Sequence, residues 1–315
     1  MYKMTLQSIF KKGLFVVLFF LYLGSTKAQQ HPMYSQYMFN MLNINPAFAG
    51  SAGVAQVTTL YRNQWIDMPG APQNTSVTFD MPVDEKKIGF GVQLFDERLG
   101  IERSTGFNLI YAFKIPVSER GTLSMGLQAG ILNYRANYTN VVTFQGNDPA
   151  FYQNINGILP SAAAGIFYNT DKFYIGFSTP ALLKTKISNQ GVADVSSATG
   201  TDLHLFLSSG YNFDVSENVV LKPSFLVKAV SGAPLEYDLN LNVWMQNIFG
   251  VGISYRTGDA IVGIAQLKLG ERLNFGYAYD KTFTNLGSYS RGSHELMLRL
   301  EIGRHTENVS SIRYN

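Results

Sequence analysis

Apolar and polar residues alternate with a period of two along most of the chain. In the stretch 106–115, aromatic and aliphatic residues occupy every second position, and mostly small or polar residues stand between them. The same alternation recurs in 219–230, 237–246 and 273–279, and the stretch 294–302 sets leucines against charged residues. This period is typical of β-strands with one apolar face, so the pattern predicts an all-β protein.

A soluble β-sandwich would show the same alternation, but three features favour a barrel that spans a membrane. The predicted strands run for about 9 to 11 residues, the length that a tilted strand needs to cross a bilayer. Tyr and Phe recur near strand ends, and the polar faces are rich in Gly, Asn and Ser, which suits a lumen. We therefore predict a transmembrane antiparallel β-barrel of about 14 strands with an N-terminal segment before the first strand.

The connections between the predicted strands alternate between short turns and longer segments. Short turns at 117–121 and 170–172 suit the periplasmic rim of a barrel, whereas 135–160, 180–202 and 281–292 are predicted to be extracellular loops. The predicted strands begin near Val54, Asn74, Ile88, Ser104, Thr122, Ser161, Phe173, Leu203, Val219, Glu236, Phe249, Ala260, Leu273 and Ser293.

The start of the chain has the features of a secretory signal peptide. Lysines precede a short apolar run at 14–23, and Ala28 ends a small-residue cleavage site. The run is too short to span a bilayer, which needs about 20 residues as a helix, so we expect cleavage near Ala28 and export to the outer membrane. The predicted organisation is a signal peptide at 1–28, a periplasmic or plug segment at 29–53, the barrel at 54–302 and a C-terminal tail at 303–315.

Composition narrows the function classes. The signal peptide holds four lysines and no acid, which leaves 21 basic against 22 acidic residues and gives no support to nucleic-acid binding. Charged residues make up 15% of the chain, below the ~25% typical of soluble domains. The sequence has no cysteine, so it offers no disulfide, thiolate metal site or cysteine for lipid attachment. It also has no phosphate-binding, metal-binding or catalytic motif, so no enzyme activity, metal or cofactor is predicted.

One segment, 33–50, is too apolar for a linker and too irregular for a strand. Its amides can satisfy an irregular backbone away from water, and Pro46 ends it in a turn. It could tuck into the periplasmic mouth of the barrel as a plug or be offered to a partner protein. Arg62 is expected to face the lumen and to pair either with barrel carboxylates or with a partner. The candidate plug or partner-binding residues are Tyr34, Tyr37, Phe39, Asn40, Asn45, Pro46, Arg62, Trp65, Gly70 and Pro72.

Four motifs occur in order near the N-terminus: YSQYMFN at 34–40, NPAFAG at 45–50, YRNQW at 61–65 and GAPQNTSVTFDMP at 70–82. With these motifs the chain resembles the PorP/SprF family of outer-membrane proteins of the type IX secretion system. The resemblance implies a non-enzymatic barrel that assists the secretion and surface attachment of a partner. That partner would be a large adhesin with a type IX C-terminal signal domain, with a link to gliding motility.

The resemblance also implies contacts with other type IX components and with outer-membrane lipid. The alternative is a small-solute porin or a substrate-specific outer-membrane channel, because the same barrel serves both functions.

Overall fold

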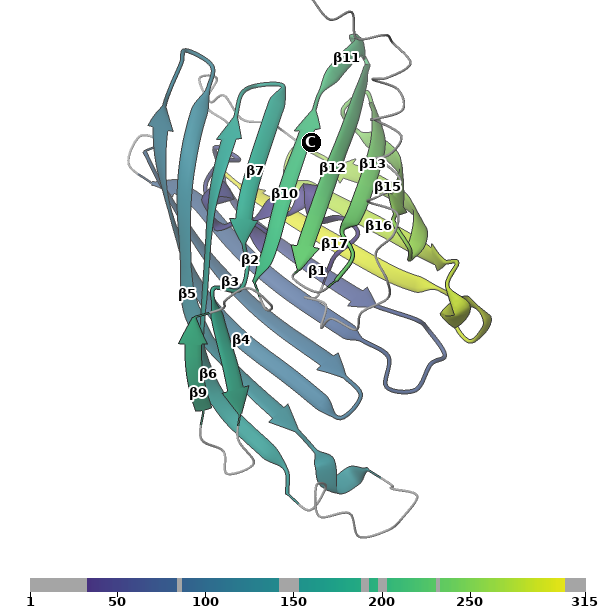
Figure 1. The fold of residues 1–315 in the computed structure, drawn as a ribbon. Coiled ribbons are helices and arrows are strands. Elements are labelled where there is room, and N and C mark those ends of the chain that lie inside the picture. The colour runs from purple at the N-terminus through teal and green to yellow at the C-terminus, as the bar shows by residue number, and fades with distance from the viewer. Residues whose placement is uncertain are drawn as a thin grey trace, which may run out of the picture.

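The structure is a computed structural model that describes residues 33–83, 87–141, 153–187, 193–197, 203–230 and 233–303. The predicted signal peptide and the predicted tail beyond Gly303 lie outside the described residues. In the described part, 14 strands form a closed antiparallel barrel (Figure 1). In chain order the strands of the ring are β1 (Ala55–Asn63), β2 (Gln73–Val83), β3 (Ile88–Leu99), β4 (Glu102–Pro116), β5 (Thr122–Ala136), β6 (Ile155–Asn169), β7 (Phe173–Thr179), β10 (His204–Tyr211), β12 (Val219–Val230), β13 (Glu236–Met245), β14 (Phe249–Arg256), β15 (Ala260–Leu269), β16 (Leu273–Thr282) and β17 (Ser293–Ile302).

Two pairings complete the ring. Strand β1 pairs with β17, and β10 pairs with β12. Closure gives each strand of a membrane barrel a partner for its backbone groups, which hydrocarbon cannot supply. The prediction of an antiparallel barrel of about 14 strands is therefore confirmed. The remaining elements are β8 (Leu183–Ile187), β9 (Ala193–Ser197), β11 (Phe213–Ser216), η1 (Tyr37–Phe39), η2 (Met41–Asn43), η3 (Pro46–Phe48), η4 (Tyr138–Asn140) and η6 (Asn285–Ser288).

Side chains alternate strictly between the two faces of the barrel wall. In β17, the outward Leu296, Leu298 and Leu300 are 43%, 48% and 44% exposed, whereas Glu295 and Arg299 are buried inside the ring. Apolar side chains on the outside meet lipid, and polar side chains on the inside meet one another or the lumen. In the sequence, therefore, the apolar positions are those that face the lipid, and the polar positions between them are those that face the barrel interior. Among the described residues, no helix is long and apolar enough to cross a membrane.

Two details differ from the predicted strands. Strand β6 begins at Ile155 rather than near Ser161, and the hairpin of β8 with β9 lies within the predicted loop 180–202. The first difference arises because Pro160 resembles a strand breaker in the sequence. It is tolerated here because β7 pairs with β6 only from Ala164 onward, which leaves one edge of β6 unpaired by β7 at Pro160.

The two ends of the barrel differ in the length of their connections. At one end the strands are joined by short turns at 117–121, 170–172 and 270–272, and the long connections 137–154 and 180–203 lie at the other. Outer-membrane barrels carry short turns on the periplasmic side and longer loops on the extracellular side, which assigns the two ends. Strands β4, β5 and β6, each of 15 residues, extend further toward the extracellular side than β7, which has 7 residues.

The core of the protein lies inside the ring. The first described residues, coloured purple in Figure 1, pass through the interior of the barrel before β1 begins. Apolar side chains of this segment, among them Tyr37 and Met38, pack against inward residues such as Leu60, Phe167 and Phe206. The N-terminal segment thus forms one apolar core with inward residues of several strands.

Candidate functional site

Residues 33–53, called the lumenal segment below, run along the barrel interior from the extracellular half to the periplasmic rim. At the periplasmic end, the Gly50 amide donates to Asp80 Oδ2 (2.8 Å) near the end of β2. At the other end, Arg62 Nη1 donates to the Ser35 hydroxyl (2.7 Å) near the extracellular end of β1. The segment therefore extends well beyond the periplasmic mouth, which was one of the two positions that the sequence left open.

Short 3₁₀ turns satisfy the backbone of the lumenal segment locally. The Asn40 amide donates to the Tyr37 carbonyl (3.0 Å), and the Ile44 amide donates to the Met41 carbonyl (3.0 Å). The Asn45 side chain accepts from the Ala47 amide (2.9 Å) and so caps η3. Proline at the first position of η3 gives up an N–H that would have no partner in the helix, and Asn45 with Pro46 thus begins this turn.

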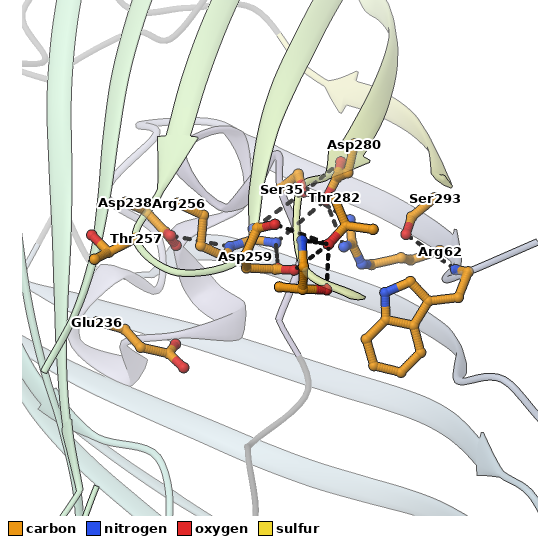
Figure 2. A network of polar contacts seen from close by, with 12 residues as sticks. Ser35, Arg62, Glu236, Asp238, Arg256, Thr257, Asp259, Asp280, Thr282 and Ser293 are labelled. Carbon is orange, nitrogen blue, oxygen red and sulfur yellow. Dashed lines mark hydrogen bonds and ion pairs between the residues drawn. The ribbon is translucent and has the colours of Figure 1, made fainter. Parts of the chain in front are cut away.

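A group of buried charges holds the extracellular end of the lumenal segment (Figure 2). Arg62 pairs with Asp280 (2.7 Å) and Glu295 (3.2 Å), and Arg256 pairs with Asp280 (3.3 Å) and Asp238 (3.1 Å). These side chains come from β1, β13, β14, β16 and β17, which form one side of the barrel. We call this group the arginine cluster; its members are Ser35, Arg62, Asp238, Arg256, Asp280 and Glu295.

The lumenal segment takes part in the arginine cluster through its own polar groups. Glu295 accepts from the backbone amides of Ser35 (2.7 Å) and Gln36 (2.8 Å), and the Ser35 hydroxyl donates to Asp280 (2.8 Å). Arg62 is 1% exposed and Glu295 is fully buried, so each charge depends on these partners. The cluster is consequently a fastening for the segment as well as a set of ion pairs within the wall.

Further polar contacts follow the segment toward its centre. The Tyr37 hydroxyl accepts from Asn240 Nδ2 (2.6 Å), and Asn40 Nδ2 donates to Thr78 Oγ1 (3.0 Å). Side chains of β13 and β2, on different sides of the ring, therefore both bind the segment.

Glycines on the inner face of the wall make room for the backbone of the lumenal segment. A Cβ atom added to Gly126 of β5 would overlap the backbone of Pro46 and Ala47. A Cβ atom added to Gly89 of β3 would overlap the Ala49 carbonyl. Glycine within a strand often marks such a close approach of another backbone. Further inward glycines that contact the segment are Gly165, Gly176 and Gly276.

A cavity of about 530 Å³ lies between the lumenal segment and the extracellular halves of β3 to β6. We call it the acidic cavity, because Glu97 and Glu102 line it and no basic residue lines it among the residues that the structure describes. Tyr134 interacts with both Glu102 and Tyr138 at its edge. Its size falls within the range of ligand pockets, roughly 300–1,000 Å³. Among the described residues, no group of three His, Cys, Asp or Glu is placed to hold a metal ion.

The extracellular loop 64–72 forms a second feature at the same end. Trp65 and Asp67 have φ angles of 43° and 75°, in the left-handed region that side chains other than glycine rarely adopt. The Ile66 amide donates to the Gly292 carbonyl (2.9 Å), and Arg291 pairs with Asp67 (2.9 Å). Contacts with the loop that precedes β17 thus hold loop 64–72 in its strained shape.

A family model described as "Type IX secretion system membrane protein PorP/SprF" matches residues 26–300. The chain belongs to the PorP/SprF family. Together with the closed barrel, the match makes this PorP/SprF chain an outer-membrane protein associated with type IX secretion. A search of curated proteins found no match to the chain.

Solved structures share the barrel fold with this PorP/SprF protein at low sequence identity. The toluene transporter TbuX of Ralstonia pickettii aligns with a TM-score of 0.50 at 10% identity, over 84% of this chain and 94% of that chain. A FadL homologue of Pseudomonas aeruginosa aligns with a TM-score of 0.46 at 11% identity, over 82% and 92%. Omp33 of Acinetobacter baumannii aligns with a TM-score of 0.44 at 10% identity, over 79% and 98%. The alignment with TbuX describes a similarity of fold alone.

The structure separates the residues that the sequence singled out into three places. Arg62 belongs to the arginine cluster, and Trp65, Gly70 and Pro72 lie in the extracellular loop 64–72. The others are buried in the lumenal segment: Tyr34, Tyr37, Phe39, Asn40, Asn45 and Pro46.

Sequence reasoning missed the residues that complete these places. Asp280 and Glu295 lie far from Arg62 in the sequence, and only the register of β1, β16 and β17 brings them together. Glu97 and Glu102 lie at the ends of predicted strands and carry no motif. A usable signal was the position of each carboxylate on the inward face, near the extracellular end of its strand.

Proposed function

We propose that this PorP/SprF protein assists type IX secretion by attaching a secreted partner protein to the outer surface of the cell. The partner we propose is a large adhesin, of the kind used in gliding motility, with a type IX C-terminal signal domain. The family match supports a role in this secretion system. The partner would meet the extracellular end of the barrel, where the acidic cavity and loop 64–72 lie.

The filled lumen is the observation that carries this proposal over a solute channel. The lumenal segment is held at one end by the arginine cluster and at the other by Asp80, with buried contacts between them. A solute passage through the barrel would require this segment to move. An attachment protein has no such requirement, because its partner binds from outside.

The proposal is tested by deleting the gene and comparing the proteins on the surface of intact cells by protease shaving and mass spectrometry. We expect one or a few large exported proteins to leave the surface and to appear in the medium, with small-solute uptake unchanged. The purified protein should give no steady conductance in planar bilayers. Altered uptake with unchanged surface proteins, or a steadily open pore, would instead favour the channel.

A further inference from the structure

The acidic cavity differs from the rest of the barrel interior in its charge. Glu97 is half-buried near the extracellular end of β3, and it makes no ion pair or hydrogen bond with another residue in the described ranges. Its neighbours across the sheet are Ser104 on β4 and Asn74 on β2, neither of which is charged. A partly buried carboxylate without a cation is stabilised either by taking up a proton or by a cation that a ligand supplies.

The adjacent residue shows how differently this wall treats a carboxylate on its other face. Asp96 accepts from Arg103 (2.6 Å), Arg98 (3.1 Å) and Thr105 (2.8 Å) on the outside of the barrel. At this level the basic residues of β3 and β4, Arg98 and Arg103, lie on the outer face. Among the described residues, no basic side chain lines the inner face beside Glu97 and Glu102.

Aromatic rings complete the chemistry of the acidic cavity. Tyr34 of the lumenal segment lines it from one side, and Tyr134 and Tyr138 line it from the other. Tyrosine rings attract a cation placed over their faces, and they attract a planar guanidinium especially well. Carboxylates together with tyrosines form a recognition site for a basic side chain.

We propose that the acidic cavity binds an arginine or lysine side chain of the secreted partner protein. The identity of the partner as a secreted protein rests on the proposed function, whereas the chemistry of the cavity does not. A calcium ion fits the cavity less well, because no group of three His, Cys, Asp or Glu among the described residues is placed to hold a metal ion. The Tyr rings favour a guanidinium, on which they can stack.

The binding test uses the full mature chain in detergent and three capped tripeptides, acetyl-Gly-Arg-Gly-amide, acetyl-Gly-Lys-Gly-amide and acetyl-Gly-Gln-Gly-amide. We expect calorimetry or ligand-observed NMR to detect the Arg and Lys peptides and not the Gln peptide. Glu97→Gln should weaken the Arg peptide by roughly tenfold to a hundredfold, the effect of losing a hydrogen bond to a charged group. Asp96→Asn, the same change one residue away on the outer face, is the matched control and should leave binding unchanged.

Each outcome decides the proposal. Equal binding of all three peptides, equal loss in both variants, or calcium binding that depends on Glu97 would overturn it. Heat-dependent mobility in gels checks that the Glu97→Gln barrel is folded, and Glu102→Gln provides a second variant if it is not. In cells, an adhesin lost on gene deletion but retained by Glu97→Gln would leave the proposed function standing and sink the cavity proposal. Peptide binding that depends on Glu97, with no change in surface proteins on gene deletion, would support the cavity proposal and overturn the proposed function.

Discussion

The two sides of the barrel treat buried carboxylates in opposite ways. On the side formed by β1 and β13 to β17, Asp238, Asp280 and Glu295 each pair with an arginine. On the side formed by β3 to β6, Glu97 and Glu102 face a cavity that no basic residue lines within the described ranges. The carboxylates of the first side are therefore paired with arginines and bind the lumenal segment. Glu97 on the second side has no such ion pair among the described residues.

This difference separates a structural role from a binding role. Buried ion pairs hold two elements together only when every charge has partners, as in the arginine cluster. Glu97 forms no ion pair among the described residues, and under the proposal above its charge serves the ligand rather than the lumenal segment. One side of the barrel wall thus binds the extracellular end of the lumenal segment. On the other side, the acidic cavity separates the wall from the segment in the extracellular half.

The largest expected effect concerns which end of the lumenal segment faces outward. The chain has no cysteine, so Met33→Cys creates a single thiol at the extracellular end of the segment. We expect this thiol to react with a membrane-impermeant maleimide on intact cells. Ala52→Cys, at the periplasmic end of the segment, should react only after the outer membrane is permeabilised.

Tyr289→Cys is the reference for surface labelling, because Tyr289 is 75% exposed in the extracellular loop before β17. Labelling of Ala52→Cys but not of Met33→Cys on intact cells would reverse the assigned direction of the segment. In that case the acidic cavity would face the periplasm, and the comparison between the two sides would lose its relation to the cell surface.

The next largest effect is the loss of the central arginine. Arg62→Ala leaves Glu295 without its cation and removes one of the two cations of Asp280. Removing one partner from a buried ion pair costs about 3–5 kcal/mol, so the free energy of unfolding should fall by that amount. Urea titration of the detergent-solubilised barrel measures it, and planar bilayers should show transient conductance as the segment loosens.

Arg98→Ala is the control for Arg62→Ala, because it removes an arginine from an exposed ion pair with Asp96. Exposed pairs contribute about 0–1 kcal/mol, so this variant should unfold close to the unchanged protein. Equal destabilisation by both substitutions would mean that the arginine cluster does not fasten the segment.

Much of this architecture could be predicted from the sequence, since alternation depends only on neighbouring residues. The inward position of Arg62 and the near-correct starts of most strands followed from period two alone. The strand β6 was predicted too short because Pro160 hides its continuation. The partners of Arg62 depend on the register between strands distant in the sequence, which a single sequence does not display. The neighbours of Glu97 depend on the register of β3 with β2 and β4.

The course of the lumenal segment could be predicted only in part. Its composition indicated an ordered segment, and Pro46 correctly marked a turn. Its depth in the barrel depends on inward glycines, Gly126 and Gly276 among them, that contact it along its length. In the sequence these glycines look like ordinary small residues of a lumenal face. Only the fold shows that they all make room for the lumenal segment.

A moderate effect is expected from filling that glycine space. Gly126→Val would force its side chain into the backbone of Pro46 and Ala47. Overpacking of this kind costs about 1–3 kcal/mol and should displace the periplasmic half of the segment while Ser35 stays bound. Protease sensitivity near Ala49 should rise. Gly263→Val is the matched control, since a Cβ atom there meets nothing within 4 Å, and an equal effect of both would contradict the close approach.

The smallest expected effect comes from giving the second side the cation that it lacks. Ser104 lies directly opposite Glu97, so Ser104→Lys places an ammonium beside that carboxylate. A cross-strand pair of opposite charge contributes about 0.2–1 kcal/mol, and the free energy of unfolding should rise within that range. Binding of the Arg tripeptide should be lost, because the new lysine now occupies its place. Ser104→Met adds similar bulk without charge and should keep part of that binding. If the lysine variant still binds the Arg tripeptide as tightly as the unchanged protein, then the guanidinium of the peptide does not bind beside Glu97.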